Sequence, residues 1–265
     1  MDLGIKGRTA LVTGGARGIG AAITRILALE GVRVIFTSRS QATIDNFLRE
    51  SENEQFVYTP VGLVNSLLER DLVFVKRYLE ENDLHVDILV NNAGDTLQVT
   101  DPFCGSDAWL RVLGLNTLIP IALVEMFAPE MIKRNWGRIV NITSCAGLEN
   151  SGPVTFSTSK AALTAYTRSM GRVLATMADG VVMSAVFPGV VATKGGHWDL
   201  ILETDRERAD RYLDARCPTG RFGSENEIAN VVAFYSSELA SFSHGAIVPV
   251  DGGQSRHFMY HNFLD

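Results

Sequence analysis

The chain has 265 residues, of which 46% are hydrophobic and 20% are charged, a composition typical of a protein with a large core rather than of a disordered or fibrous one. The net charge of −6 and the pI near 5.4 argue against a general attraction to nucleic acid or to an anionic membrane. Three cysteines, Cys104, Cys145 and Cys217, are spaced too widely for a disulfide framework or a zinc site, so we expect reduced thiols, a cytoplasmic location and no metal.

Short apolar runs rich in β-branched residues alternate with longer stretches of helical periodicity, which predicts βαβ units and a parallel sheet. In chain order, the expected strands are Thr9–Thr13, Arg33–Ser38, Phe56–Val61, Val86–Asn91, Arg138–Thr143, Val181–Phe187 and Ala246–Val250. A first helix is expected to end at Glu30 and Gly31, and others lie near 41–50, 66–82, 107–134, 153–178 and 225–236. No linker divides them, so the expected fold is α/β, a doubly wound parallel sheet of seven strands in a single domain, residues 1–265.

The longest stretch without a strand pattern runs from Val190 to Arg221 and is expected to be a loop. Loops of that length usually act as lids or binding segments. Residues 194–217 are therefore expected to form a lid over a substrate.

No membrane span or secretion signal is expected. The most apolar stretch, from Leu110 to Pro129, is interrupted by Arg111 and Glu125, which makes it too polar to span a membrane by this criterion. The first residues also lack the charged and then apolar pattern of a secretion signal.

The first expected strand leads into a glycine-rich segment that opens a helix, residues 13–20 (TGGARGIG). Glycines at positions such as Gly14, Gly18 and Gly20 permit a tight turn and a close approach of backbone N–H groups to a pyrophosphate, which then lies at the positive end of the helix dipole. An isolated glycine motif is about as often an ordinary turn. Its place between a strand and a helix favours dinucleotide binding.

The second expected strand ends at Ser38 and Arg39, without an Asp or Glu to accept hydrogen bonds from a ribose 2′-hydroxyl. Arg39 and Arg17 would instead clamp a 2′-phosphate, because the planar guanidinium suits phosphate oxygens. A lone arginine is more often a solvated surface residue, but here the acidic alternative is missing as well. The expected cofactor is NADP(H) rather than NAD(H).

Ordered motifs along nearly the whole chain resemble those of the short-chain dehydrogenase/reductase family. They are the glycine-rich loop, an Asn-Asn-Ala-Gly segment, an asparagine in the next helix, a serine after the fifth strand, a segment like Tyr-x-x-x-Lys, a Pro-Gly-x-x-x-Thr segment and a final Val-Asp-Gly-Gly. In this sequence they occupy residues 13–20, 91–94, 116, 144, 156–160, 188–193 and 250–253. The resemblance implies a Rossmann-like sheet, a nicotinamide cofactor, a small-molecule substrate and a homo-oligomer, either a tetramer or a dimer.

The resemblance also implies which positions contact the cofactor. Where the family often has an acidic residue near the adenine, this chain has Leu63, so backbone or apolar surface is expected to supply that contact. The expected cofactor-binding residues are Gly14, Arg17, Gly18, Ile19, Gly20, Ser38, Arg39, Leu63, Asn92, Ala93, Gly94, Lys160, Pro188, Gly189, Val191 and Thr193.

The implied catalytic site departs from the family at one position. In the family a tyrosine donates a proton to the substrate oxygen, a lysine lowers the pKa of the tyrosine and holds the nicotinamide ribose, a serine binds the substrate oxygen, and an asparagine supports a proton path. These roles carry over to Lys160, Ser144 and Asn116, but Phe156 stands where the tyrosine would be, one helical turn from Lys160. Phenylalanine has no hydroxyl. Because a general acid contributes roughly 10²–10⁴-fold, the usual reaction should be severely slowed or absent.

Each of these positions also has a structural interpretation. Lys160 and Ser144 would separately be ordinary helix and strand-end residues, and their joint spacing around position 156 favours a site. Asn116, in an otherwise apolar helix, would bond to backbone if it were not part of a relay. Cys145 is expected to be a packed thiol rather than a nucleophile.

Phe156 leaves three functions open. The chain is a reductase whose tyrosine was replaced, for example by engineering, or a natural NADP(H)-binding protein that serves as a sensor or partner. In the third alternative, another group supplies the proton. The first is favoured because every other catalytic position is intact. Candidates for the other donor are Tyr212, His197 and Ser157.

Substrate contacts are expected from Ser144, His197 and Trp198. The polar and basic composition of the expected lid favours a hydroxylated or anionic substrate such as a sugar acid or sugar phosphate. The alternative is a 3-oxoacyl thioester of an acyl-carrier protein, because the family includes such reductases. An acidic carrier would meet Lys133, Arg134, Arg168 and Arg172.

Overall fold

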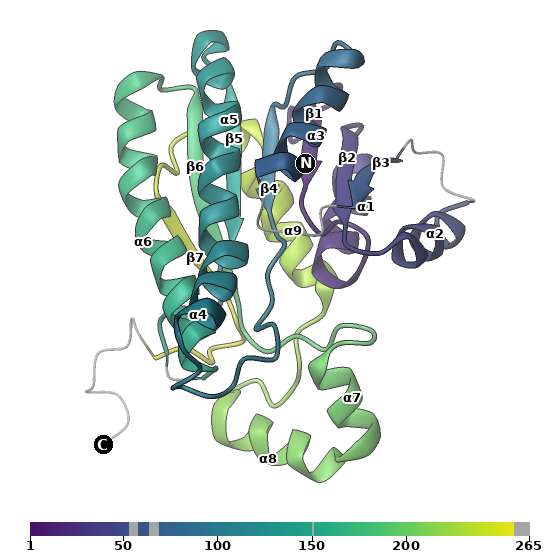
Figure 1. Ribbon diagram of the computed structural model, residues 1–265, viewed down its shortest axis with the longest axis vertical. Helices are drawn as coiled ribbons and strands as arrows, with labels where there is room; N and C mark the ends of the chain where they lie inside the picture. The colour runs from purple at the N-terminus through teal and green to yellow at the C-terminus, as the bar shows by residue number, and fades with distance from the viewer. Residues whose placement is uncertain (53–57, 64–68, 150, 257–265) are drawn as a thin grey trace.

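A parallel sheet of seven strands lies in the middle of the computed structural model, which describes residues 1–52, 58–63, 69–149 and 151–256 (Figure 1). The strands are β1 (Thr9–Val12), β2 (Arg33–Ser38), β3 (Tyr58–Leu63), β4 (Ile88–Asn91), β5 (Gly137–Ile142), β6 (Val181–Pro188) and β7 (Ala246–Val250). Their spatial order is β3-β2-β1-β4-β5-β6-β7, and all neighbours pair in parallel. The predicted doubly wound, Rossmann-like sheet is confirmed.

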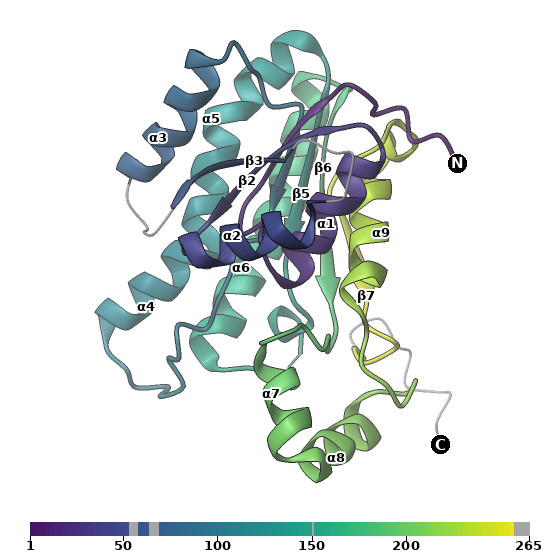
Figure 2. The ribbon, with the colours of Figure 1, turned by 90° about the vertical axis from the view of Figure 1, so that its right-hand side faces the viewer.

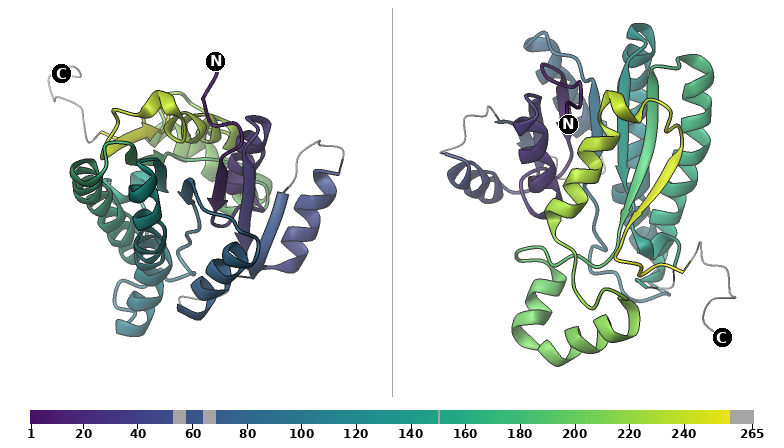
Figure 3. Two further views of the ribbon diagram at one scale, coloured as in Figure 1. Left: turned by 90° about the horizontal axis from the view of Figure 1, so that it is seen from above. Right: turned by 180° about the vertical axis from the view of Figure 1, so that it is seen from behind.

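Helices cover both faces of the sheet (Figures 2 and 3). One face carries α1 (Gly18–Leu29), α2 (Gln41–Glu50) and α9 (Glu225–Tyr235). The other carries α3 (Glu69–Glu81), α5 (Ile119–Arg134) and α6 (Val154–Met177), with α4 (Ser106–Leu113) packed on α6.

The central strands β1 and β4 are mostly apolar because their successive side chains enter different cores. Val12 packs with the α1 side of the sheet, whereas its neighbour Leu11 packs with the α5 side. Val90 and Leu89 repeat this division in β4. The continuous apolar runs in the sequence are the consequence of a sheet buried on both faces.

The strand order reverses between β1 and β4. From β1 the chain builds outward to β2 and β3 and then returns to form β4 on the other side of β1. In open α/β sheets, ligands bind beyond the carboxyl ends of the strands at such a switch point. Thr13 and Asn92, which directly follow β1 and β4, lie at this crevice.

Several boundaries differ from the sequence prediction. The fourth strand begins at Ile88 instead of Val86, and the buried Asp87 carboxylate before it accepts the Thr9 N–H at 3.0 Å and pairs with Arg134 at 3.4 Å. The third strand continues to Leu63. Residues 56–57 of that predicted strand, and 66–68 of the predicted helix after it, lie outside the described residues.

The stretch from Val190 to Arg221 was expected to be a loop, and that expectation was wrong, because it contains α7 (His197–Thr204) and α8 (Arg206–Arg216). The Asp205 side chain caps α8 by accepting the Arg208 N–H at 3.0 Å. Ion pairs one turn apart support α8, whereas its buried side chains are only Ala209 and Leu213, too few to show a helical period in the sequence. The two helices project beyond the carboxyl edge of the sheet (Figures 1 and 2).

The predicted helix 107–134 is one helical stretch interrupted by a π-helical turn, η1 (Gly114–Leu118). By length and composition alone, Ser106–Arg134 is apolar enough to cross a membrane, so the earlier exclusion from its polar residues was too strict. Half of its most apolar window is buried within the protein, where Leu123, Val124 and Met131 join the core.

Candidate active site

Glycine is required at several positions of the loop between β1 and α1. Gly14 and Gly18 have positive φ angles of 65° and 53°, which side chains rarely adopt. A Cβ at Gly20 would lie 2.1 Å from the Gly14 carbonyl oxygen and 2.5 Å from Asn92 Nδ2. The backbone of the loop therefore packs directly against itself and against Asn92, with no room for a side chain at Gly20.

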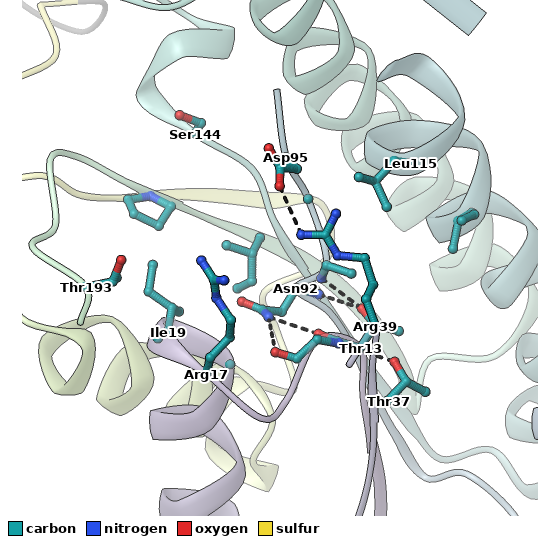
Figure 4. A pocket seen from close by; sticks show the side chains of 18 of the residues that line it. Thr13, Arg17, Ile19, Thr37, Arg39, Asn92, Asp95, Leu115, Ser144 and Thr193 are labelled. Atoms are coloured by element: carbon teal, nitrogen blue, oxygen red, sulfur yellow. Dashed lines mark hydrogen bonds and ion pairs between the residues drawn. The ribbon is translucent and has the colours of Figure 1, made fainter. Parts of the chain in front are cut away.

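The amino end of α1 faces the crevice without a side-chain cap. Its N-cap residue, Arg17, is extended and makes no capping hydrogen bond. The first N–H groups of a helix carry partial positive charge and bind anions readily. In Figure 4 the Arg17 side chain rises from this end into the pocket, where it adds a full positive charge.

Asn92 ties the segment after β4 to the glycine loop. Its Nδ2 donates to the Thr13 and Gly14 carbonyl oxygens at 2.9 and 3.2 Å, and the Thr13 hydroxyl accepts the backbone N–H groups of Asn92 and Ala93 at 3.0 Å each (Figure 4). These bonds hold the two loops at the switch point in one arrangement. Gly94 follows directly and lines the same pocket.

The carboxyl end of β2 brings Ser38 and Arg39 to the pocket. Leu63 pairs in register with Ser38, so its backbone ends at the same edge of the sheet. Arg39 does not project freely: its Nη2 lies 3.0 Å from Asp95 Oδ2, on the loop after β4 (Figure 4). Asp95 was not singled out from the sequence.

The first turns of α6 place Phe156 and Lys160 on one side, facing the pocket. Lys160 is only 4% exposed, and its Nζ donates to the Ile142 carbonyl oxygen at 2.8 Å. Burial lowers the pKa of Lys160 to about 8. Its Nζ lies 5.7 Å from the centre of the half-buried Phe156 ring.

Ser144 directly follows β5 and is half-buried at the same pocket. Its hydroxyl accepts the Ala146 N–H at 3.2 Å, which leaves the hydroxyl proton available for another acceptor. The neighbouring Cys145 is buried, and burial raises the pKa of its thiol, as expected of a packed side chain and not of a nucleophile.

Asn116 lies in the π-helical turn η1, fully buried, and does not line the pocket. Its Nδ2 donates to the carbonyl oxygens of Asp95 and Val112 at 2.8 and 2.9 Å, and its Oδ1 accepts the Asp95 N–H at 3.2 Å. A Cβ at Gly94 would lie 2.7 Å from Asn116 Oδ1 and 2.8 Å from Lys160 Nζ. A side chain at position 94 would therefore collide with both Asn116 and Lys160, which lie on either side of Gly94.

One cavity of about 690 Å³ joins these parts, from the glycine loop to Ser144, Phe156 and Lys160. Of the predicted cofactor and catalytic positions, only two are not among its lining residues: the buried Asn116 and Leu63, whose side chain is not described. At the end of β6 and just after it, its wall is formed by Pro188, Gly189, Val191 and Thr193.

The comparison with known proteins agrees with this architecture. Residues 8–197 match the family profile of the short chain dehydrogenases. The chain belongs to the short-chain dehydrogenase family. This short-chain dehydrogenase is 37% identical to 3-oxoacyl-[acyl-carrier-protein] reductase FabG of Aquifex aeolicus, over 96% of the chain and 99% of the relative.

Solved structures extend the comparison to family members with bound cofactor. A 3-oxoacyl (acyl-carrier-protein) reductase from Agrobacterium tumefaciens C58 with NADP is 29% identical, with a TM-score of 0.84 over 95% of this chain and 96% of that one. L-Sorbose reductase from Gluconobacter frateurii, complexed with NADPH and L-sorbose, is 25% identical, with a TM-score of 0.87 over 98% and 100%.

The predicted substrate residues are not all brought together in this short-chain dehydrogenase. Trp198 of α7 lines the cavity, whereas the His197 ring packs edge-on against Trp198 with the ring centres 5.3 Å apart and does not line the cavity. Neither Tyr212 nor Ser157, the other suggested proton donors, lines it. Sequence reasoning missed the lining residues Asp95, Leu97, Arg111 and Leu115, which carry no motif. Within the described part of the chain, no three His, Cys, Asp or Glu side chains are grouped so as to hold a metal.

Proposed function

We propose that the chain is an NADP(H)-dependent oxidoreductase that interconverts a carbonyl and a secondary alcohol on a small polar substrate, in a form impaired by Phe156. The observation that carries the proposal is the cavity, which joins an uncapped helix end to Ser144 and Lys160 in one continuous space. Relatives of this short-chain dehydrogenase hold NADP or NADPH.

The glycine loop suits the dinucleotide. A side chain at Gly20 would clash with the Gly14 carbonyl oxygen, and one at Gly18 would contact Thr193, so glycine keeps this turn tight. The N–H groups that open α1 would then bind the charge of a pyrophosphate. Arg39 and Arg17 would bind a 2′-phosphate. Lys160 and the Pro188–Thr193 wall would hold the nicotinamide end.

When bound, the nicotinamide supplies or accepts a hydride; the protein must manage the proton and the charge on the substrate oxygen. The Ser144 hydroxyl would donate a hydrogen bond to that oxygen. Lys160, whose burial keeps its pKa near 8, would raise the local positive potential, and Asn116 would support a proton path behind Gly94. Phe156 fills the place of the proton donor with a ring that has no proton to give.

Two alternatives remain beside this proposal. The Phe156 ring over Lys160 favours a non-catalytic NADP(H)-binding sensor or partner, because it preserves the shape of the site without its acid. The alternative proton donors His197, Tyr212 and Ser157 lack this support, since none of them lines the cavity. Sequencing the source gene at codon 156 separates an engineered replacement from a natural one.

For the substrate, we favour a hydroxylated or anionic small molecule, in line with the sorbose-reducing relative and with Ser144 and Trp198 at the cavity. A 3-oxoacyl thioester is the alternative, supported by relatives that act on acyl-carrier protein. The four basic residues suggested for carrier docking do not line the cavity, and Arg134 and Arg168 bond instead to backbone before β4 and β7, at the opposite edge of the sheet.

We further propose that residues 194–217, with α7 and α8, act as the substrate lid of a single domain, because Trp198 is their contact with the cavity.

The three free cysteines support a cytoplasmic location. Exposed apolar side chains on α4, η1 and α6 support a homo-oligomer.

Phe156→Tyr tests the proposal. Restoring the hydroxyl should raise NADP(H)-dependent kcat/KM by roughly 10²–10⁴-fold on the true substrate, the scale of general-acid catalysis, and should leave NADPH affinity nearly unchanged. Both forms are assayed against sugars, polyols, hydroxy acids and 3-oxoacyl thioesters, and NADPH binding is titrated separately. The matched control, Phe242→Tyr, adds the same oxygen to a fully exposed ring and should change neither quantity.

The outcomes separate the alternatives. Suppose that the tyrosine form binds NADPH but shows no activity on any member of a panel that contains its ligand. That result favours the non-catalytic protein. Full activity with phenylalanine, and no gain with tyrosine, assigns the proton to another group.

A further inference from the structure

The ion pair between Arg39 and Asp95 crosses the cofactor crevice. Arg39 follows β2, Asp95 follows β4, and β1 lies between these two strands in the sheet. The pair, with Nη2 and Oδ2 3.0 Å apart, therefore spans the carboxyl end of β1, where the glycine loop starts (Figure 4). Both side chains line the cavity proposed for NADP(H).

The two partners differ in how firmly they are held. Asp95 Oδ1 accepts the Leu97 N–H at 3.0 Å, and the Asp95 backbone bonds to the fully buried Asn116 at both its N–H and its carbonyl. Arg39 is a long side chain that is 51% exposed, and among the described residues its only polar partner is the Asp95 carboxylate. The carboxylate is thus fixed by its turn, while the guanidinium is free to exchange partners.

We propose that Asp95 is a specificity-determining residue that competes with the cofactor 2′-phosphate for Arg39 and so limits the preference for NADP(H) over NAD(H). The inference rests on the proposed cofactor function. A 2′-phosphate that takes the Arg39 guanidinium breaks the ion pair and brings its own negative charge toward the Asp95 carboxylate. NAD(H) has no such phosphate and leaves the pair intact.

The test compares adenosine 2′,5′-bisphosphate with AMP, two probes that differ in the 2′-phosphate, by calorimetric titration of the full chain. Asp95→Asn removes the charge but keeps an oxygen to accept the Leu97 N–H. This variant should lower the Kd of the bisphosphate by about two- to tenfold and should leave the Kd of AMP unchanged. That is the scale expected when an exposed ion pair with Arg39, and the repulsion between the Asp95 carboxylate and the 2′-phosphate, are both removed. NADPH and NADH should show the same difference.

Asp101→Asn is the matched control. Asp101 lies in the same loop, its Oδ1 accepts the Phe103 N–H at 2.9 Å in a similar turn, and it does not line the cavity. This variant should leave both probes unchanged. Asp95→Asn should also lose its effect in an Arg39→Ala background, because Arg39 carries the competition.

Four results overturn the inference while leaving the cofactor proposal intact, and three of them concern the controls. They are equal changes for both probes, an equal effect of Asp101→Asn, and a full effect of Asp95→Asn without Arg39. Weaker bisphosphate binding by Asp95→Asn also overturns it, since Asp95 would then orient Arg39 for the phosphate. If the unmodified chain binds neither NADPH nor NADH, the cofactor proposal fails and the inference fails with it.

Discussion

Phe156 differs from the tyrosine of the family by one oxygen atom, and we expect the loss of that oxygen to affect proton transfer but not ligand binding. The Phe156 ring lies beside Lys160 at the cavity, and the ring itself has no proton to donate to a substrate oxygen. Lys160 remains buried against the Ile142 carbonyl, with its pKa lowered by that burial to about 8. The cost of burying this amine is therefore present in a chain that has no hydroxyl at position 156 for the lysine to act on.

The arginine at position 39 offers a separate test of the cofactor. Arg39→Asp should reduce or reverse the preference for NADPH, because it replaces the proposed phosphate clamp with a carboxylate beside Asp95 that repels phosphate and accepts a ribose hydroxyl. Titration of NADPH and NADH on both forms measures the ratio of affinities. Equal affinities in the unmodified chain, or an unchanged ratio in the variant, would remove Arg39 from cofactor binding.

At the level of elements, α7 and α8 form a small unit with its own apolar centre. Trp198 packs on Tyr212 and Phe222, with ring centres 4.3 and 5.3 Å apart, and this cluster joins Leu213 and Cys217. Gly195 has a φ of 67° and no heavy atom within 4 Å of the place a Cβ would take. A helical pair with its own apolar centre, entered through a glycine, is suited to moving as one piece.

We therefore expect hydrogen exchange from Gly195 to Arg216 to slow when cofactor and substrate bind together, as the pair closes over the nicotinamide end of the cavity. Exchange followed by mass spectrometry, with cofactor alone as the reference, measures the added protection. Protection confined to Gly14–Gly20, with none added in α7 and α8, would show that these helices are not a lid.

For the whole molecule, the distribution of exposed apolar side chains is uneven. Leu110, Leu118, Val173 and Met177 are exposed on α4, η1 and α6, which lie on the same face of the sheet, and Phe103 precedes α4 at 92% exposure. Several exposed apolar side chains on one face of the molecule favour a protein interface there. A homo-oligomer would cover it.

Sedimentation of the unmodified chain should give two or four times the protomer mass of 28.9 kDa. Leu118→Glu places a charge on the apolar face and should shift the population toward smaller species. Leu29→Glu, at a similarly exposed leucine on the opposite face of the sheet, is the control and should not. A monomeric unmodified chain at micromolar concentration would reject the oligomer.

The sequence alone determined the strand and helix order and most of the cavity, because these depend on local signals. The glycines at 14, 18 and 20 indicate a tight turn with positive φ angles and close backbone contacts. The apolar runs indicate a sheet buried on both faces. The absence of a hydroxyl at Phe156 is also a property of the residue itself. Local signals failed for α8, whose helix rests on a cap and surface ion pairs rather than on an apolar stripe.

Only the tertiary structure decided which residues meet across the strands. Asp95 belongs to no motif and lies 56 residues from Arg39, yet parallel strands end at a common edge and bring both to one crevice. Folding likewise placed His197 outside the cavity and buried Asn116 behind Gly94. Sequence spacing specifies neighbours along one element, whereas contacts between elements depend on sheet order and helix packing, which arise only when the whole chain buries its core.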